Sequence, residues 1–271
     1  MDQYILVRFK STEEQTAIIA AFLMDIGFEG IEESDIGSVA CIKSVSFDKE
    51  ATEAIFKQFH TEFEMELVAQ QNWNAQWEQS FDPVIVDDFV AIRASFHQPV
   101  TQVKHELIIT PKMSFGTGHH ATTYLVMQLM QTIGFAGKSV IDFGTGTGVL
   151  AILAEKLGAT NIVGIDNDDW SINNALENVE SNDCHHIRLI KADAMVEDKK
   201  ADVILANINL NVIVANLDAI KAACKPGAVV VFSGLMTQDE EQTRNHLTNH
   251  QFEVMLCVAK TNWIALKTQL I

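Results

Sequence analysis

From residue 121 onward, short apolar runs alternate with longer segments in which apolar residues recur every three or four positions. The short runs are typical of buried strands, and the longer segments have helical periodicity. We therefore expect strands at 139–143, 161–166, 187–191, 203–207, 228–233, 253–259 and 263–267. We expect helices at 121–133, 149–157, 170–179, 211–223 and 238–247. This alternation predicts an α/β fold with a doubly wound, mainly parallel seven-stranded sheet, and the short link 260–262 predicts a final antiparallel hairpin.

The first part of the chain has a different pattern, with elements in the order β-α-β-β-α-β. We expect strands at 4–9, 28–33, 38–42 and 65–68, and helices at 11–27 and 49–60. Ser11 and Glu14 form a capping-box pattern at the start of the first helix, and Gly27 is suited to end it. This order predicts a small α+β domain, a ferredoxin-like sandwich.

A polar stretch over 70–82 predicts a helical linker, which Pro83 ends. Trp73 and Trp77 share one face of that helix, and packing between domains explains them better than a ligand cage. Further strands are expected at 84–86, 89–94 and 105–109. The sequence therefore predicts a first domain over 1–69, a linker over 70–82 and a second domain over 83–271.

The composition is that of a folded protein. The 271 residues suffice for two unequal domains, and 48% are hydrophobic whereas 20% are charged. No apolar run is long enough to cross a bilayer, and the start of the chain does not resemble a signal peptide. The cysteines are widely spaced, which predicts reduced thiols in a cytoplasmic protein. Nothing in the sequence requires an oligomer, so we expect a monomer.

The formal net charge is −17. An acidic protein repels a phosphate backbone, so we expect no direct binding to nucleic acid. Such a charge would instead steer a basic partner toward the chain. Solubility alone would also account for it, and the sequence leaves both explanations open.

The strongest local motif is VIDFGTGTG, in which a strand runs through Asp142 into Gly144, Gly146 and Gly148. Glycines let the backbone turn sharply and let a ligand approach the main chain, while the next helix directs its N–H groups at that ligand. Dinucleotide sites prefer the spacing G-x-G-x-x-G, which is not found here. An acidic Asp142 suits a cationic amino group better than a pyrophosphate. The motif therefore favours S-adenosylmethionine over a nicotinamide cofactor.

Two acidic residues stand at the ends of neighbouring strands. Asp166 ends the strand 161–166, where its carboxylate is able to accept hydrogen bonds from both ribose hydroxyls of an adenosine. An N-cap is the alternative for Asp166, but Asp168 and Asp169 are better placed for that role. Asp193 follows the strand 187–191, where its carboxylate is suited to accept the adenine amino group, and an ordinary turn residue explains it nearly as well.

Asn207 ends the strand 203–207. In an open α/β sheet the carboxyl ends of the strands form the ligand crevice. The side-chain carbonyl of Asn207 is suited there to accept a hydrogen bond from a substrate amine and to align its lone pair with a methyl group. Asn209 and Asn211 fit ordinary roles as loop and helix-cap residues.

A second glycine-rich stretch, MSFGTGHHATT, precedes the turn and contains His119 and His120. Adjacent side chains rarely bind one ion, and no cluster of Cys, Asp or Glu completes a site, so we expect no metal. No G-x-S-x-G elbow supports a serine hydrolase. The sequence lacks the glycine spacing that a nicotinamide-dependent oxidoreductase would have. A non-catalytic binding module stays open as an alternative.

Together these motifs resemble the ribosomal protein L-eleven methyltransferases (PrmA), a family of class I S-adenosylmethionine-dependent methyltransferases. The resemblance covers nearly the whole chain and rests on FGTGHHATT before DFGTGTGVLAILAEKLGA, followed by VGIDNDD, NALEN, ILANI and VVFSGL. It implies S-adenosylmethionine as cofactor and methylation of lysine side-chain or N-terminal amines of a basic large-subunit ribosomal protein. A class I methyltransferase acting on another protein or a small amine is the alternative.

The resemblance also implies roles for individual residues. Gly144 would pass closest to the methionine part of the cofactor, which Gly146 would also help to bind, Asp166 would bind the ribose, and Asn207 would border the reacting methyl group. Thr123 would contact the cofactor, and the preceding loop would cover it through Phe115, Gly116 and Thr117. The N-terminal domain would recognise the substrate protein.

Two stretches depart from the family pattern, GHHATT in the first loop and INLN after Asn207. Both bear on substrate choice or the degree of methylation rather than on cofactor binding. The implied reaction needs no strong general base, because desolvation favours the neutral amine and its proton is able to leave to water. Alignment of the amine, with Asn207 as the aligning residue, would supply most of the catalysis.

Overall fold

A computed structural model describes residues 3–28, 30–34, 37–69, 82–112, 115–195 and 200–271. Contacts within the chain divide it into one compact unit over Met1–Ser80 and a second over Phe81–Ile271. The predicted linker, with Trp73 and Trp77, lies outside the described residues except for Asp82. The exact division into 1–69, 70–82 and 83–271 therefore stays a prediction.

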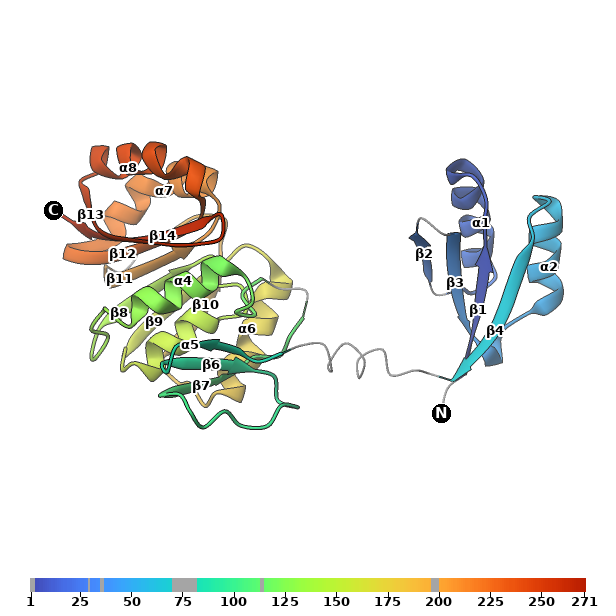
Figure 1. The fold of residues 1–271 in the computed structure, drawn as a ribbon, viewed down its shortest axis with the longest axis horizontal. Coiled ribbons are helices and arrows are strands. Elements are labelled where there is room, and N and C mark those ends of the chain that lie inside the picture. The colour runs from blue at the N-terminus through green and yellow to red at the C-terminus, as the bar shows by residue number, and fades with distance from the viewer. Residues whose placement is uncertain (1–2, 29, 35–36, 70–81, 113–114, 196–199) are drawn as a thin grey trace. The chain divides into compact units, whose positions relative to one another are not determined.

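The first unit, blue in Figure 1, is a four-stranded antiparallel sheet with two helices packed against it. Its elements are β1 (Gln3–Phe9), α1 (Glu13–Asp25), β2 (Gly30–Ser34), β3 (Gly37–Lys43), η1 (Ser44–Ser46), α2 (Lys49–Gln58) and β4 (Phe63–Ala69). Val7 on the central strand β1 pairs with Ala40 on β3 and Met65 on β4. The strand order β2-β3-β1-β4 is that of a ferredoxin-like sandwich, so this prediction is confirmed.

The ends of α1 show which sequence signals act locally. Thr12 is the N-cap, and its Oγ1 accepts a hydrogen bond from the Gln15 N–H over 3.3 Å. The prediction that Ser11 begins the helix was wrong, because its hydroxyl lies 2.7 Å from Thr16 Oγ1 instead of capping the first turn. Gly27 does end the helix, with φ +97° and its N–H bonded to the Met24 carbonyl.

The second unit is built on a seven-stranded sheet (Figure 1). Its strands are β8 (Ser139–Phe143), β9 (Asn161–Asp166), β10 (Ile187–Lys191), β11 (Ala201–Asn207), β12 (Cys224–Met236), β13 (Phe252–Lys260) and β14 (Trp263–Leu270). They lie in the order β10-β9-β8-β11-β12-β14-β13, and β14 runs antiparallel to both of its neighbours while the others are parallel. The predicted mainly parallel sheet and C-terminal hairpin are therefore confirmed.

Helices cover both faces of this sheet. They are α4 (Ala121–Met130), α5 (Val149–Lys156), α6 (Asp169–Ser181), α7 (Leu210–Ala223) and, after the short helix η2 (Thr237–Asp239), α8 (Glu240–Asn249). Leu205 of β11 is buried in one core with α4 and α5, whereas the preceding Ile204 is buried in the other core with α7 and α8. No helix in the described parts of the chain is long and apolar enough to span a membrane.

The three strands before α4 form a separate small sheet. They are β5 (Val84–Val86), β6 (Val90–Arg93) and β7 (His105–Ile108), with β5 antiparallel to β6 and β6 parallel to β7. Val86, Ile92 and Leu107 join the core formed by α4 and α5. The end of β7 is therefore anchored in this core at Leu107 and Ile109.

Candidate active site

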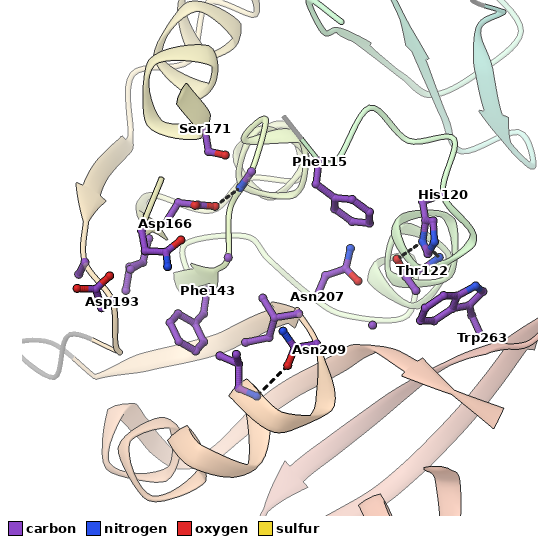
Figure 2. A pocket seen from close by; sticks show the side chains of 18 residues that line it. Phe115, His120, Thr122, Phe143, Asp166, Ser171, Asp193, Asn207, Asn209 and Trp263 are labelled. Carbon is purple, nitrogen blue, oxygen red and sulfur yellow. Dashed lines mark hydrogen bonds between the residues drawn. The ribbon is translucent and has the colours of Figure 1, made fainter. Parts of the chain in front are cut away.

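A cavity of about 510 Å³ opens at the carboxyl ends of β8, β9 and β11, within the size range of small-molecule sites. It is lined by Phe115, His120, Thr122, Phe143, Gly144, Gly146, Ile165, Asp166, Asn167, Ser171, Ala192, Asp193, Asn207, Ile208, Asn209, Val212, Gly234 and Trp263. Figure 2 shows Asp166 and Asp193 on one side with Phe143 beside them, Phe115, His120 and Trp263 on the other side, and Asn207 between the two. Most of the predicted site residues therefore meet in one cavity.

Glycines shape the turn between β8 and α5. Gly144, Gly146 and Gly148 have φ of +78°, +54° and +80°, a conformation that other residues rarely adopt. A Cβ on Gly144 would lie 2.2 Å from Ile208 Cγ2, and a Cβ on Gly146 would lie 2.3 Å from the Phe115 carbonyl oxygen. The turn therefore requires glycine for two reasons: its backbone conformation, and the close packing of Ile208 and Phe115 against it.

Asp142 lies beneath this turn rather than in the cavity wall. Its side chain is fully buried, and Thr145 Oγ1 donates a hydrogen bond to Asp142 Oδ2 over 2.7 Å. Burial raises the pKa of the Asp142 carboxyl to about 7, although the Thr145 hydrogen bond opposes the shift. Asp142 does not line the cavity, and the expectation that its carboxylate holds a cationic amino group stays a prediction.

Asp166 ends β9 and lines the cavity (Figure 2). Its Oδ2 accepts a hydrogen bond from the Gly146 N–H over 2.8 Å, and its Oδ1 accepts one from the Asp168 N–H over 3.1 Å. Asp168 is the N-cap of α6 and accepts a hydrogen bond from the Ser171 N–H over 3.0 Å. The cap explanation for Asp166 is thereby excluded, and its carboxylate is held beside the glycine turn.

Asn207 ends β11 and is 8% exposed. Its Nδ2 donates a hydrogen bond to Thr123 Oγ1 of α4 over 3.3 Å. Its Oδ1 is buried and has no hydrogen-bond partner among the described residues. An unpaired buried carbonyl costs roughly 1–3 kcal/mol, so a donor from a ligand would be favoured here. Thr123 is fully buried, lies outside the lining of the cavity, and supports Asn207.

Aromatic side chains form the opposite wall from the acidic residues (Figure 2). The ring centroids of Phe115 and His120 lie 5.1 Å apart, and those of His120 and Trp263 lie 4.8 Å apart. Gly116 and Thr117 follow Phe115 but do not line the cavity, and Thr117 Oγ1 lies 3.3 Å from His119 Nδ1. Of the three predicted covering residues, Phe115 therefore supplies the contact surface.

Sequence reasoning missed two of these aromatic residues. His120 was considered only as a metal ligand, whereas its Nδ1 lies 2.8 Å from Thr122 Oγ1 at the start of α4. Trp263 begins β14, and no local signal marks it, because only the strand order brings it to the cavity. Among the residues that the structure describes, no group of three or more His, Cys, Asp or Glu is arranged to hold a metal ion.

The lining fits a cofactor that contains an adenosine. Asp166 and Asp193 present carboxylates that are able to accept hydrogen bonds from hydroxyl and amino groups. Phe143, Ile165 and Ile208 provide apolar surface beside them for a flat base. Asn207 lies between this acidic side and the aromatic side, and its unpaired Oδ1 offers an acceptor for a second ligand. The cavity is thus suited to two ligands, one of them a nucleoside.

This sheet order, with one antiparallel strand beside the edge and a cavity over the glycine turn between β8 and α5, defines the protein as a class I methyltransferase. The family model for ribosomal protein L11 methyltransferase (PrmA) matches residues 5–270. The chain therefore belongs to the ribosomal protein L11 methyltransferase family. The resemblance found in the sequence is confirmed, and S-adenosylmethionine is the cofactor expected of such an enzyme.

Individual relatives agree with this assignment. The ribosomal protein L11 methyltransferase of Phocaeicola vulgatus is 35% identical in an alignment of 276 positions, which covers 98% of this chain and 98% of the relative. That of Porphyromonas gingivalis is 37% identical over 230 residues, which cover 82% of this chain and 79% of the relative. A crystal structure of ribosomal protein L11 methylase from Lactobacillus delbrueckii subsp. bulgaricus matches with a TM-score of 0.65 and 28% identity, covering 69% of this chain and 98% of that one.

Proposed function

We propose that this protein transfers methyl groups from S-adenosyl-L-methionine to amines of ribosomal protein L11, at lysine side chains, the N-terminal amine or both. The names of its relatives support this substrate. The net charge of −17 suits a basic protein substrate, because opposite fields favour encounter. In this proposal the enzyme acts as a monomer and does not bind nucleic acid directly.

The unpaired Oδ1 of Asn207 is the observation that carries the proposal. An amine placed beside it would donate an N–H to this oxygen, which relieves the cost of the buried carbonyl. The same hydrogen bond would orient the nitrogen lone pair, since the amide is already held by Thr123 Oγ1. Asn207 therefore acts in this proposal as the residue that binds and aligns the substrate amine.

The acidic side of the cavity would hold the cofactor. Asp166 would accept hydrogen bonds from the ribose hydroxyls and Asp193 from the adenine amino group, while the backbone of Gly144 and Gly146 would face the methionine part. When bound, S-adenosylmethionine supplies a methyl group activated by a positively charged sulfur. Phe115, whose carbonyl oxygen packs against Gly146, would cover the methionine part from the opposite wall, and Thr123 would contribute through its hydrogen bond with Asn207.

The aromatic side would receive the substrate amine. A lysine has a pKa of about 10.4, so on the order of one side chain in a thousand is neutral at pH 7. Phe115 and Trp263 would exclude water from the ammonium group and thereby lower its pKa, which favours the neutral form. The apolar stem of lysine suits these walls. Its proton would leave to water, so no side chain needs to act as a strong base.

We also propose that the N-terminal unit recognises the protein substrate. Its edge strand β4 presents Met65 and Leu67, which are 42% and 60% exposed. Apolar side chains exposed side by side on one strand face are suited to contact another protein.

Intact-mass spectrometry of ribosomal protein L11, incubated with the full chain and S-adenosylmethionine, tests this function. We expect mass gains in steps of about 14 Da, one for each methyl group, and fragmentation should place them on lysine or N-terminal amines. A reaction without S-adenosylmethionine is the control. No gain on L11, with cofactor binding still measured by calorimetry, would reject this substrate in favour of another protein or a small amine. Methylation of a different residue type would reject the amine chemistry.

A further inference from the structure

In chain order, FGTGHHATT is the first glycine-rich stretch and VIDFGTGTG is the second, and the two meet at Thr147, which is fully buried in the second. Its N–H donates a hydrogen bond to the Phe115 carbonyl over 3.0 Å, and its Oγ1 donates one to the Gly116 carbonyl over 2.7 Å. A Cβ on Gly116 would lie 2.9 Å from Thr147 Oγ1, so the two segments are in direct contact. Thr147 thus fixes the backbone of Phe115 and of the residue that follows it.

Asn178 of α6 completes this arrangement. Its Nδ2 donates a hydrogen bond to the Thr147 carbonyl over 2.9 Å, and its Oδ1 accepts one from the Thr110 N–H over 2.8 Å. The Asn178 side chain is fully buried, so these hydrogen bonds are shielded from water. Thr110 lies at the start of the segment that leads to Phe115. One amide therefore joins that segment and the glycine turn.

Asn178 belongs to a row of buried asparagines, with Asn174 one turn earlier on α6 and Asn182 at the C-cap of the same helix. Asn182 Oδ1 accepts a hydrogen bond from the Ile108 N–H over 2.8 Å, and Asn182 Nδ2 donates one to the Ile108 carbonyl over 2.6 Å. Asn174 Nδ2 donates one to the Thr110 carbonyl over 3.3 Å. The row thus satisfies the backbone along the free edge of β7, as a neighbouring strand would. Of the three, Asn178 also reaches the glycine turn.

We propose that Thr147 and Asn178 are positioning residues that set cofactor affinity through Phe115. The inference rests on the proposed function, because the position of Phe115 matters only if this cavity binds the cofactor. Phe115 is 53% exposed, so side-chain packing alone holds it weakly. Its backbone is instead held in the cavity wall by the hydrogen bonds that Thr147 donates to the carbonyl groups of Phe115 and Gly116. Neither Thr147 nor Asn178 lines the cavity itself.

Thr145 offers a matched control in the same turn. It is also buried, but its hydroxyl donates to Asp142 within the turn, whereas the Thr147 hydroxyl donates to the first glycine-rich stretch. Valine has nearly the shape of threonine without the hydroxyl. Thr147→Val and Thr145→Val therefore remove the same chemical group from the same turn, and only the first loses a hydrogen bond to the segment that carries Phe115.

Calorimetric titration of the full chain with S-adenosylhomocysteine tests the inference. We expect Thr147→Val to raise the Kd about threefold to tenfold, as the loss of one buried hydrogen bond implies. Thr147→Ser keeps the hydroxyl and should bind like the wild type. In a Phe115→Ala background, Thr147→Val should have little further effect, whereas the effect of Thr145→Val should multiply with that of Phe115→Ala.

A wild-type Kd in Thr147→Val, or effects of Thr147→Val and Phe115→Ala that simply multiply, would overturn the inference. Absence of binding by the wild type would instead overturn the proposed function, and the inference with it. Thermal unfolding checks that each variant is folded. If Thr147→Val does not fold, Asn178→Asp and Asn182→Asp decide: the first should weaken binding because it loses the donor to Thr147, and the second should not. Equal effects of these two variants would also overturn the inference.

Discussion

Asp142→Asn gives a test of the turn beneath the cavity, because it replaces a buried carboxyl with a neutral group of the same shape. The carboxamide oxygen of this variant would still accept the hydrogen bond that Thr145 Oγ1 donates in the wild type. The substitution therefore removes one titrating group and leaves the packing of β8 nearly unchanged. The difference in free energy of unfolding between wild type and variant should therefore change with pH as Asp142 titrates.

The sign and size of this effect come from the pKa of Asp142. Burial raises it from 3.8 to about 7, so the folded protein holds the proton more tightly than the unfolded chain. The resulting stability is fully present below the unfolded pKa and is lost as pH rises through the folded pKa. A shift of about three units corresponds to roughly 4 kcal/mol, of which about 2.5 kcal/mol is lost between pH 5 and 8.

Another group titrates in the same range with the opposite sign. Burial lowers the pKa of His105, so its contribution to stability rises as pH increases toward the unfolded value. His105 is present in both proteins, so its effect cancels when the free energies of unfolding of wild type and variant are subtracted. The difference between the two proteins therefore isolates Asp142.

Urea unfolding at pH 5, 6.5 and 8 measures this difference, with amide exchange of β8 reporting on the second unit alone. We expect the free energy of unfolding of the wild type, relative to Asp142→Asn, to fall by about 2.5 kcal/mol from pH 5 to pH 8. A difference in the free energy of unfolding that is the same at every pH would reflect the buried carboxamide, so only the change of this difference with pH tests the pKa. A difference that does not change with pH would refute the raised pKa.

Three further substitutions test individual positions. Gly144→Ala should prevent cofactor binding or lower the free energy of unfolding by more than about 1 kcal/mol, because φ is +78° and the added Cβ would meet Ile208. Gly134→Ala is the control, since its added Cβ would have no atom within 4 Å and should change the thermal unfolding temperature little. Asp166→Ala should raise the Kd for S-adenosylhomocysteine at least about tenfold by calorimetry, and an unchanged Kd would remove its ribose role. Asn209→Ala should lower the free energy of unfolding in urea by about 1 kcal/mol, because Asn209 Oδ1 caps α7 at the Val212 N–H, and unchanged stability would contradict this cap.

The sequence predicted the fold best where strands are short apolar runs with clear ends. β8, β9 and β10 have the predicted bounds, because each short apolar run ends where the chain leaves the sheet. β12 begins at Cys224, whereas the predicted strand began at residue 228. The prediction missed these residues because Lys225-Pro226-Gly227 is not a typical strand sequence, and only pairing with β11 makes it part of the strand. The cap at Thr12 depended on a choice between adjacent hydroxyls, which the sequence does not determine.

The site was predictable where it follows from topology and hidden where it depends on side-chain direction. Asp166 and Asn207 were found because they end parallel strands at the crevice. The burial of Asp142 beneath the turn was not predicted, because a strand buried on both faces gives no sign of which face a polar residue occupies. The hydrogen bond from Thr147 to Gly116 and the position of Trp263 come from contacts between distant segments, which one sequence does not reveal.

Turnover and cofactor affinity of Asn207→Ala, measured on the same preparation, test most directly whether this amide aligns the substrate amine. Methyl transfer to ribosomal protein L11 should fall at least about tenfold, while the Kd for S-adenosylhomocysteine should change by less than about threefold, because the lost hydrogen bond is made to the amine and not to the cofactor. Equal losses in turnover and affinity, or an unchanged turnover, would contradict the role of Asn207.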